Sequence, residues 1–276
     1  MIYENKEKNI YIRANNIEIG NKVSFGENIR ITTKGDFKLG DFSRLGDNCN
    51  FEGNNIIIGK HFYNSGAMIV GAGGQTYPNA NLIIGDRCVV HNNIINICEP
   101  VEIGDDVGFS GRVEVITHGF WQSVLEGYPV SFKGVKIENG VILGFGSTLL
   151  MGASIAENIV LGSNSLVTKR LDLKKSVYAG SPAKFIRKIK EVKYEDKIKL
   201  LDSIIDEYQK ISKYQNISPK INLKFPHITI NKFNFNVITF EYSGIEDKET
   251  DNFRDYIRKW GIRIYTERPF DTHFKF

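Results

Sequence analysis

Large aliphatic residues recur every six positions over much of the first two thirds of the chain. The clearest run, residues 137–166, divides into the consecutive hexads IENGVI, LGFGST, LLMGAS, IAENIV and LGSNSL. Every hexad begins with Ile or Leu and carries a small or β-branched residue at its fifth position. Shorter runs with shifted phase keep the same rule, and they begin at Ile19, Leu39, Ile58, Ile84 and Ile103.

This six-residue period fits neither an amphipathic helix, whose apolar residues return every three or four positions, nor a single alternating strand. It predicts short strands separated by tight turns, where glycine and asparagine, such as Gly104 and Asn158, supply backbone conformations that other residues rarely adopt. Coils of this kind pair about 4.8 Å apart, and their stacking buries an aliphatic column that one coil cannot bury alone. We therefore predict a parallel β-helix.

The end of the repeat carries the most specific motif. The hexads lead into VTK and then, from Ser176, into SVYAGSPAKFIRKI. This segment resembles the hexapeptide-repeat acyltransferases, whose closing signature is G-x-P-A-K-x-I-R, and the resemblance covers residues from about 10 to 189. It implies a left-handed triangular prism with three hexads per coil, an exception to the right-handed crossover rule. The expected fold is mainly β, with an acyltransferase domain at 1–189.

The hexad pattern is interrupted after Val115. The segment that follows is too polar and aromatic for hexad positions, so residues 118–134 are expected to leave the prism as a loop that begins at His118. A neutral imidazole can take the proton of an alcohol that attacks a thioester, which is worth about 10²- to 10⁴-fold in rate. The resemblance gives His118 the role of general base. Glu114, Glu126 and a main-chain carbonyl are equal candidates for orienting its second ring nitrogen.

Two pairs of residues point to a cofactor groove. Gly144 and Phe145 precede Gly162 and Ser163 by 18 positions, so they should stack on adjacent coils. By resemblance, the pantetheine arm of acetyl-CoA lies along them. Phe145 departs from the family, which usually has a small residue there, and it either narrows the groove or packs on the arm. Basic side chains suit the phosphates of the nucleotide end, which the resemblance places against Thr168, Lys169, Lys184 and Arg187.

The sequence gives weaker evidence for the residues that bind the acceptor. The resemblance implies a homotrimer with active sites between subunits. The candidates for binding a sugar are the aromatics of the loop and the polar side chains of the coil before His118, namely Asn92, Asn93, Asn96 and Glu99. Of these we select Asn93, Glu99 and Trp121. Asparagines in such coils are often turn residues instead. The aromatics Phe120, Trp121 and Tyr128 either stack on a sugar face or bury the loop against the prism.

From residue 190 the pattern changes to a C-terminal segment, 190–276. Apolar residues between 192 and 211 return at intervals of three, four and seven, which predicts an amphipathic helix. HITINKFNFNVITFEY predicts two strands, EDKETDNFRDYIRKWG a helix that ends at Gly261, and IRIYTE a further strand. The segment has no catalytic constellation. We expect a small α+β appendage that packs on the prism or across the trimer.

Composition narrows the classes of function. The chain of 276 residues is 41% hydrophobic and 25% charged, with no apolar run long enough for a spanning helix and no signal peptide, so a cytoplasmic protein without membrane insertion is expected. A net charge of +4 suits a phosphorylated cofactor or an acidic sugar and is too small to indicate nucleic acid. Cys49, Cys88 and Cys98 lack the CxxC spacing of zinc or redox sites.

The γ-carbonic anhydrases share the predicted fold and bind zinc through three histidines. His61, His91 and His118 lack the close histidine pair that they use, so no metal is expected. We predict an acetyl-CoA-dependent O-acetyltransferase that modifies a hydroxyl of a sugar or glycan by direct transfer in a ternary complex. An acidic sugar such as a sialic acid and neutral polysaccharides both fit. The alternatives are an N-acyltransferase on an amino sugar or sugar nucleotide, and a non-catalytic trimeric glycan-binding scaffold.

Overall fold

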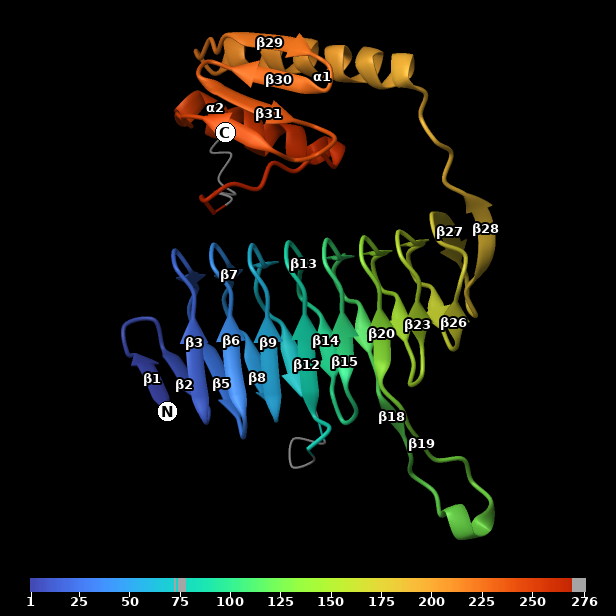
Figure 1. The fold of residues 1–276 in the computed structure, drawn as a ribbon. Coiled ribbons are helices and arrows are strands. Elements are labelled where there is room, and N and C mark those ends of the chain that lie inside the picture. The colour runs from blue at the N-terminus through green and yellow to red at the C-terminus, as the bar shows by residue number, and fades with distance from the viewer. Residues whose placement is uncertain (72, 74–77, 270–276) are drawn as a thin grey trace. The chain divides into compact units, whose positions relative to one another are not determined.

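The computed structural model describes residues 1–71, 73 and 78–269. The chain divides into two compact units, Met1–Ile189 and Lys190–Phe276. The first unit contains the hexad repeat (Figure 1).

Three sheets form the walls of the first unit (Figure 1). Sheet A contains β1 (Ile2–Asn5), β2 (Ile10–Arg13), β5 (Ile29–Thr33), β8 (Asn50–Gly53), β11 (Ile69–Gly71), β14 (Ile94–Asn96), β17 (Glu114–Val115), β22 (Thr148–Leu149) and β25 (Leu166–Val167). Sheet B contains β3 (Asn16–Ile19), β6 (Asp36–Leu39), β9 (Asn55–Ile58), β12 (Asn81–Ile84), β15 (Val101–Ile103), β20 (Val135–Ile137), β23 (Ser154–Ile155) and β26 (Arg170–Leu171). Sheet C contains β4 (Ser24–Phe25), β7 (Arg44–Leu45), β10 (Tyr63–Asn64), β13 (Val89–Val90), β16 (Gly108–Phe109), β21 (Ile142–Leu143), β24 (Val160–Leu161), β27 (Ser176–Ala179) and β28 (Lys184–Lys188).

Each coil runs from sheet B to sheet C to sheet A and back to sheet B, so the prism has three edges, here named B–C, C–A and A–B. Neighbouring strands within a sheet are parallel, except for the terminal pairs β1 with β2 and β27 with β28. In the regular part the pairing partners are 18 positions apart, as in Ile142 with Val160 and Thr148 with Leu166. Three hexads therefore make one coil.

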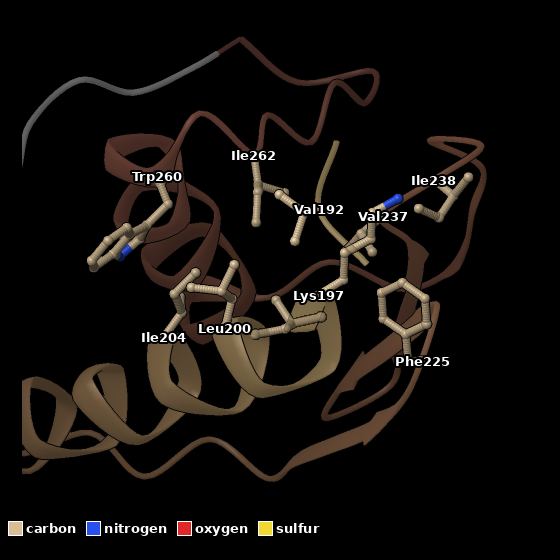
Figure 2. A pocket seen from close by; sticks show the side chains of 10 residues that line it. Val192, Lys197, Leu200, Ile204, Phe225, Val237, Ile238, Trp260 and Ile262 are labelled. Atoms are coloured by element: carbon tan, nitrogen blue, oxygen red, sulfur yellow. The ribbon is translucent and has the colours of Figure 1, made fainter. Parts of the chain in front are cut away.

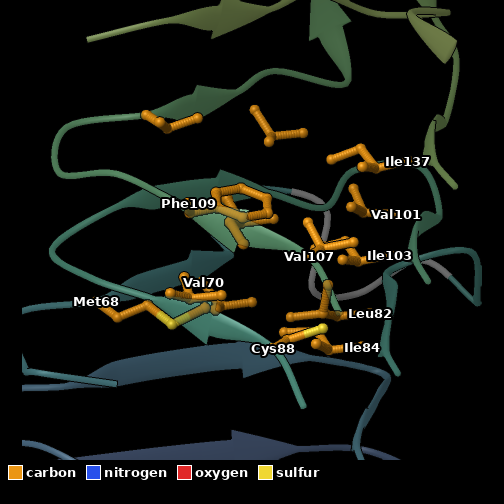
Figure 3. Packing of buried hydrophobic residues seen from close by; sticks show 14 of the residues in the cluster. Met68, Val70, Leu82, Ile84, Cys88, Val101, Ile103, Val107, Phe109 and Ile137 are labelled. Carbon is orange, nitrogen blue, oxygen red and sulfur yellow. The ribbon is translucent and has the colours of Figure 1, made fainter. Parts of the chain in front are cut away.

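The hexad leaders fill the interior of the prism. Ile137, Leu143, Leu149, Ile155 and Leu161 are all buried and belong to one continuous apolar cluster. Figure 3 shows the middle of this column, where side chains from different walls, including Val70, Leu82 and Phe109, point toward one another. The predicted fold class is confirmed: a left-handed parallel β-helix prism followed by a helix and a small α+β segment.

The turns at the edges need glycine and asparagine for two different reasons. Asn158 adopts the predicted left-handed backbone conformation, with φ of 57°. Gly104 does not have a positive φ, but a Cβ placed on it would lie 2.2 Å from Oδ1 of Asn139 on the next coil. Close approach between coils, rather than the backbone conformation predicted for it, thus explains this glycine.

The second unit packs helices on a small antiparallel sheet (Figure 1). Its elements are α1 (Tyr194–Tyr214), β29 (Ile221–Lys224), β30 (His227–Ile230), β31 (Phe233–Asn236), β32 (Tyr242–Gly244), α2 (Lys248–Ile257) and the 3₁₀ helix η2 (Arg258–Trp260). The two predicted helices and two of the predicted strands are present. The strand predicted at residues 262–267 is not formed, and the sheet instead gains β29 and β32, which the pattern did not indicate.

The helix α1 lies over this sheet because its apolar face matches the sheet's inner face. Leu201, Ile205 and Tyr208 of α1 share a buried cluster with Ile228 and Phe233. Within the described ranges, no helix has both the length and the hydropathy needed to span a membrane.

Candidate active site

The loop predicted at 118–134 is a β-hairpin that projects from the A–B edge (Figure 1). Its base pairs β18 (His118–Gly119) with β19 (Ser131–Phe132) in antiparallel register, and the 3₁₀ helix η1 (Val124–Glu126) forms its tip. Glu114 pairs with Thr148, 34 positions later, instead of the 18 that separate Thr148 from Leu166. The difference of 16 residues is the hairpin, which is inserted between two otherwise continuous coils.

His118 is half-buried at the base of this hairpin. Its ring stacks on Phe132 across the strand pair, with centroids 5.8 Å apart, and contacts Phe120 at 5.4 Å. These two phenylalanines also stack on each other. A Cβ on Gly119 would lie 2.8 Å from the Cε of Met151, which shows how closely the hairpin base approaches the next coil. The aromatic packing holds the imidazole at the prism surface.

The partner of His118 is a side-chain amide from the preceding coil. Nδ1 of His118 lies 2.9 Å from Oδ1 of Asn96, the last residue of β14. The contact is therefore made neither by Glu114 or Glu126 nor by a main-chain carbonyl, the candidates that the sequence left open. Asn96 was itself among the polar residues considered for acceptor binding. With Nδ1 engaged, Nε2 is the ring nitrogen available to a substrate.

Asn96 belongs to a buried polar network beneath the hairpin. Its Oδ1 also lies 2.5 Å from Oγ1 of Thr117, and its Nδ2 donates to the carbonyl of Gly71 at 3.0 Å. The backbone N–H of Glu99 donates to Oγ1 of Thr117 at 3.2 Å. Sequence reasoning missed Thr117 entirely, because a buried threonine beside a strand carries no catalytic signal of its own.

The predicted cofactor residues fall into two groups. Gly144 and Phe145 follow β21, Gly162 and Ser163 follow β24, and both pairs lie on the C–A edge. The predicted stacking is close: a Cβ on Gly144 would lie 2.5 Å from the backbone nitrogen of Ser163. Phe145 is exposed, and the guanidinium of Arg112 lies over its ring at 5.6 Å.

Lys184 extends the same edge, and Arg187 lies further along β28. Both are exposed; Lys184 pairs with Ala179 at the end of β27, whereas Arg187 pairs with Val177 near its start. A Cβ on Gly162 would lie 2.9 Å from the Cβ of Ala179, so the strand pair that carries the two basic residues adjoins the stacked glycines. Small residues and backbone thus lead along the C–A edge toward a positive end.

Thr168 and Lys169 lie elsewhere, on the A–B edge that also carries His118. They follow β25, two coils beyond β17, which is about 10 Å along the prism at the usual strand spacing. The outer face of sheet A separates them from the stacked glycines. Within one chain, the eight predicted cofactor residues therefore flank a wall of the prism instead of lining one groove.

The predicted acceptor residues differ in accessibility. Asn93 is 1% exposed, and its Oδ1 accepts the backbone N–H of Val113 at 2.6 Å, so it is the turn residue that asparagines in such coils often are. Glu99 is half-exposed on the A–B edge and accepts a hydrogen bond from Asn79. Trp121 is 89% exposed on the hairpin. Asn93 cannot contact an acceptor without a rearrangement of its coil.

The three cysteines are buried, and burial disfavours their reactive thiolate form. Burial raises the pKa of Cys49 to about 11 and that of Cys88 to about 12. Burial also raises the pKa of Cys98, which lies near the Asn96 network. In the part of the chain that the structure describes, no three His, Cys, Asp or Glu side chains gather as a metal-ligand group.

A hollow of about 300 Å³ in the second unit is of a different kind (Figure 2). Figure 2 shows its lining side chains, which come from the segment before α1, the first half of α1, the turns next to β29 and β31, and the residues after α2. All are apolar or aromatic except Lys197, as in Leu200, Phe225, Val237 and Trp260. It lacks the convergent polar groups that orient a substrate.

Comparison with known proteins finds an O-acetyltransferase among the curated relatives. No protein-family model matches the chain. The galactoside O-acetyltransferase of Lactococcus lactis subsp. lactis (strain IL1403) is 32% identical over 154 residues, which are 54% of this chain and 65% of that protein. An uncharacterised protein of Dictyostelium discoideum is 28% identical over 172 residues, 60% of this chain and 59% of its own length. The chain thus spans less than two thirds of each curated relative.

Solved structures include hexapeptide-repeat proteins. The polySia specific acetyltransferase NeuO matches 74% of this chain and 95% of its own, with a TM-score of 0.49 and 20% identity. A hexapeptide-repeat acetyltransferase of Vibrio cholerae O1 biovar eltor, complexed with acetyl-CoA, matches 47% of this chain and 66% of its own, with a TM-score of 0.33 and 19% identity. The predicted resemblance to the hexapeptide-repeat acyltransferases is confirmed, and the relative of 32% identity is an O-acetyltransferase.

Proposed function

We propose that this chain, which resembles the hexapeptide-repeat acyltransferases, is an acetyl-CoA-dependent O-acetyltransferase acting on a hydroxyl of a sugar or glycan, with His118 as general base. The observation that carries the proposal is the position of His118. It lies where a hairpin leaves the prism, with Nδ1 held by Asn96 at 2.9 Å and Nε2 available to a substrate. The galactoside O-acetyltransferase match adds the reaction type.

The proposed reaction needs one base and no covalent enzyme intermediate. Nε2 of His118 takes the proton of the acceptor hydroxyl as the oxygen forms a bond to the acetyl carbonyl carbon. The tetrahedral oxyanion then collapses, the C–S bond breaks, and the leaving thiolate receives the proton from the imidazolium. Direct transfer requires both substrates at His118 together, which is a ternary complex.

We propose that both groups of predicted residues, those on the C–A edge and those on the A–B edge, bind acetyl-CoA. The small residues Gly144 and Gly162 leave backbone exposed for the pantetheine arm, with Phe145 and Ser163 beside it. The charges of Lys184, Arg187 and Lys169, with the hydroxyl of Thr168, would bind the phosphates. Since the two groups flank sheet A within one chain, a single cofactor contacts both only if the groove is completed by a neighbouring subunit.

We therefore include a homotrimer in the proposal. The hairpin tip exposes apolar side chains that pack on nothing in their own prism, above all Leu125, which is 93% exposed, and Trp121. Such surface on an extended arm is typical of a subunit contact. The active site would lie between two prisms, with Glu99 and Trp121 beside the acceptor. Both an acidic sugar, such as a sialic acid, and a neutral sugar or polysaccharide are included in the proposal as acceptors.

The test is release of coenzyme A from acetyl-CoA with a panel of neutral sugars, sialic acids and amino sugars. The parent should acetylate a hydroxyl of at least one sugar, and His118→Gln should lose about 10²- to 10⁴-fold in kcat. His227→Gln is the matched control, because His227 lies on the sheet of the second unit. Full activity of His118→Gln would show that His118 is not the general base. Transfer to amines alone would favour an N-acyltransferase, and no transfer or coenzyme A binding would favour a scaffold.

A further inference from the structure

We propose that Asn96 is the positioning residue of this site: its amide holds His118 in the tautomer with a proton on Nδ1 and a lone pair on Nε2. The catalytic consequence rests on the proposed function, whereas the tautomer itself does not. The sequence suggested acceptor binding for polar residues of this coil, and the structure assigns Asn96 a different task.

The orientation of the Asn96 amide follows from its neighbours. On one side lies the carbonyl of Gly71, 3.0 Å away, which can only accept. On the other side lies the backbone N–H of Thr117, 3.3 Å away, which can only donate. A flipped amide would set oxygen against oxygen and N–H against N–H. The amide oxygen must therefore face Thr117 and His118.

The neighbouring hydroxyl fits this orientation of the amide. Oγ1 of Thr117 accepts the N–H of Glu99 at 3.2 Å, and its own proton donates to Oδ1 of Asn96 at 2.5 Å. An amide oxygen accepts only, so the 2.9 Å contact with Nδ1 of His118 requires that Nδ1 carry the proton. A neutral imidazole has one N–H, which leaves the lone pair on Nε2, where a general base needs it.

Burial makes this arrangement rigid. Asn96 is 5% exposed and Thr117 is fully buried, so water has little access to replace either group. Asn96 is also fixed on β14 by pairing with Gly71 of β11, and β14 in turn pairs with β17, which leads into the hairpin. Strand pairing on both sides of β14, within sheet A, thus holds the amide under the imidazole.

The direct test is a tautomer measurement by NMR on the full chain labelled with ¹⁵N-histidine. The His118 signals are identified by their loss in His118→Gln. We expect the Nδ1–H pattern in the parent at a pH where the ring is neutral, and an Nε2–H pattern would overturn the inference. Because this measurement uses the unchanged protein, it does not depend on whether a variant folds.

A variant then tests whether the Asn96 amide selects the tautomer of His118. Asn96→Ala should release the ring to mixed tautomers. The control is Asn64→Ala, since Asn64 is likewise buried and bridges coils, accepting from the N–H of Gly46 and donating to the carbonyl of Val90. That change should leave the His118 signals as they are. An unaltered His118 pattern in a folded Asn96→Ala would show that the amide is not what selects the tautomer.

Kinetics separate positioning from acceptor binding. Asn96→Ala should lower kcat by about 10- to 100-fold, by analogy with groups that orient metal-binding histidines, with the KM of the acceptor unchanged. In a His118→Gln background it should have no further effect, because the two residues act as one unit. A raised acceptor KM with unchanged kcat would instead make Asn96 an acceptor ligand. Absence of any acyl transfer would refute the proposed function, while the NMR result would still decide the tautomer.

Discussion

Gly144 should be intolerant of even one added methyl group, because the coils touch there. A Cβ on Gly144 would lie 2.5 Å from the nitrogen of Ser163 and 2.6 Å from the carbonyl oxygen of Leu161. These are backbone atoms, which cannot rotate away, and the N–H of Gly144 already donates to that carbonyl at 2.8 Å. Gly144 lacks a positive φ, so Gly144→Ala tests the contact alone.

The structure also supplies the magnitude and a matched control. Overpacking a fitted contact costs about 1–3 kcal/mol, and each kcal/mol lowers Tm by about 2–4 °C in a unit of this size. Gly144→Ala should therefore melt about 2–12 °C below the parent. Gly108 lies on sheet C in the preceding coil, also without a positive φ, and a Cβ there meets nothing within 4 Å. Gly108→Ala should keep the parent Tm or exceed it slightly, because alanine reduces the entropy of the unfolded chain.

The assay is thermal unfolding of the full chain, followed by far-ultraviolet circular dichroism at one protein concentration, since self-association also changes Tm. Equal melting of Gly144→Ala and the parent would refute the close-contact reasoning. An equal loss in Gly108→Ala would show that any methyl on this wall destabilises the prism. Coenzyme A binding by the folded variant would then test separately whether Gly144 also lines the cofactor groove.

Further predictions concern other sites. Thr117→Val removes the hydrogen bonds of a buried hydroxyl and should lower the free energy of unfolding in urea by about 1–3 kcal/mol; no loss would contradict the network. Burial lowers the pKa of His91, so the unfolded chain binds its proton first as pH falls through 6.5, and stability should decrease below that pH, less so in His91→Gln. Cys49 and Cys88 should resist alkylation, followed by mass spectrometry, until the chain unfolds. Leu125→Ser should weaken self-association in sedimentation experiments, and unchanged association would place the subunit contact elsewhere.

The fold could be predicted because every hexad has the same local structure. Its first, aliphatic residue must be buried, and a turn must follow within six residues. The period alone therefore predicts where each strand and each turn lies and which side chains face the interior. In the second unit the prediction was less complete, since β29 and β32 have no pattern of their own. Both become strands by pairing with β30 and β31, whose alternation the sequence did show.

The parts of the site that follow the repeat were also predictable. The 18-residue spacing correctly stacks Gly144 on Gly162, and the break after Val115 correctly marks where the hairpin leaves. What the spacing could not give was the edge on which each residue lies. Thr168 follows Ser163 by five positions, yet the chain crosses sheet A between them, and the two lie on different edges.

The partner of His118 escaped prediction because the coils are unequal. A strict repeat places Pro100, 18 positions earlier, under His118. In the structure that coil is longer: Ile94 pairs with Glu114, 20 positions later, and Asn96 lies under the histidine from 22 positions away. Ile56 and Leu82 are separated by 26, so no single period holds across the prism. The contacts between coils therefore depend on the length of every turn, and only the register of the strands reveals that an amide lies beneath His118.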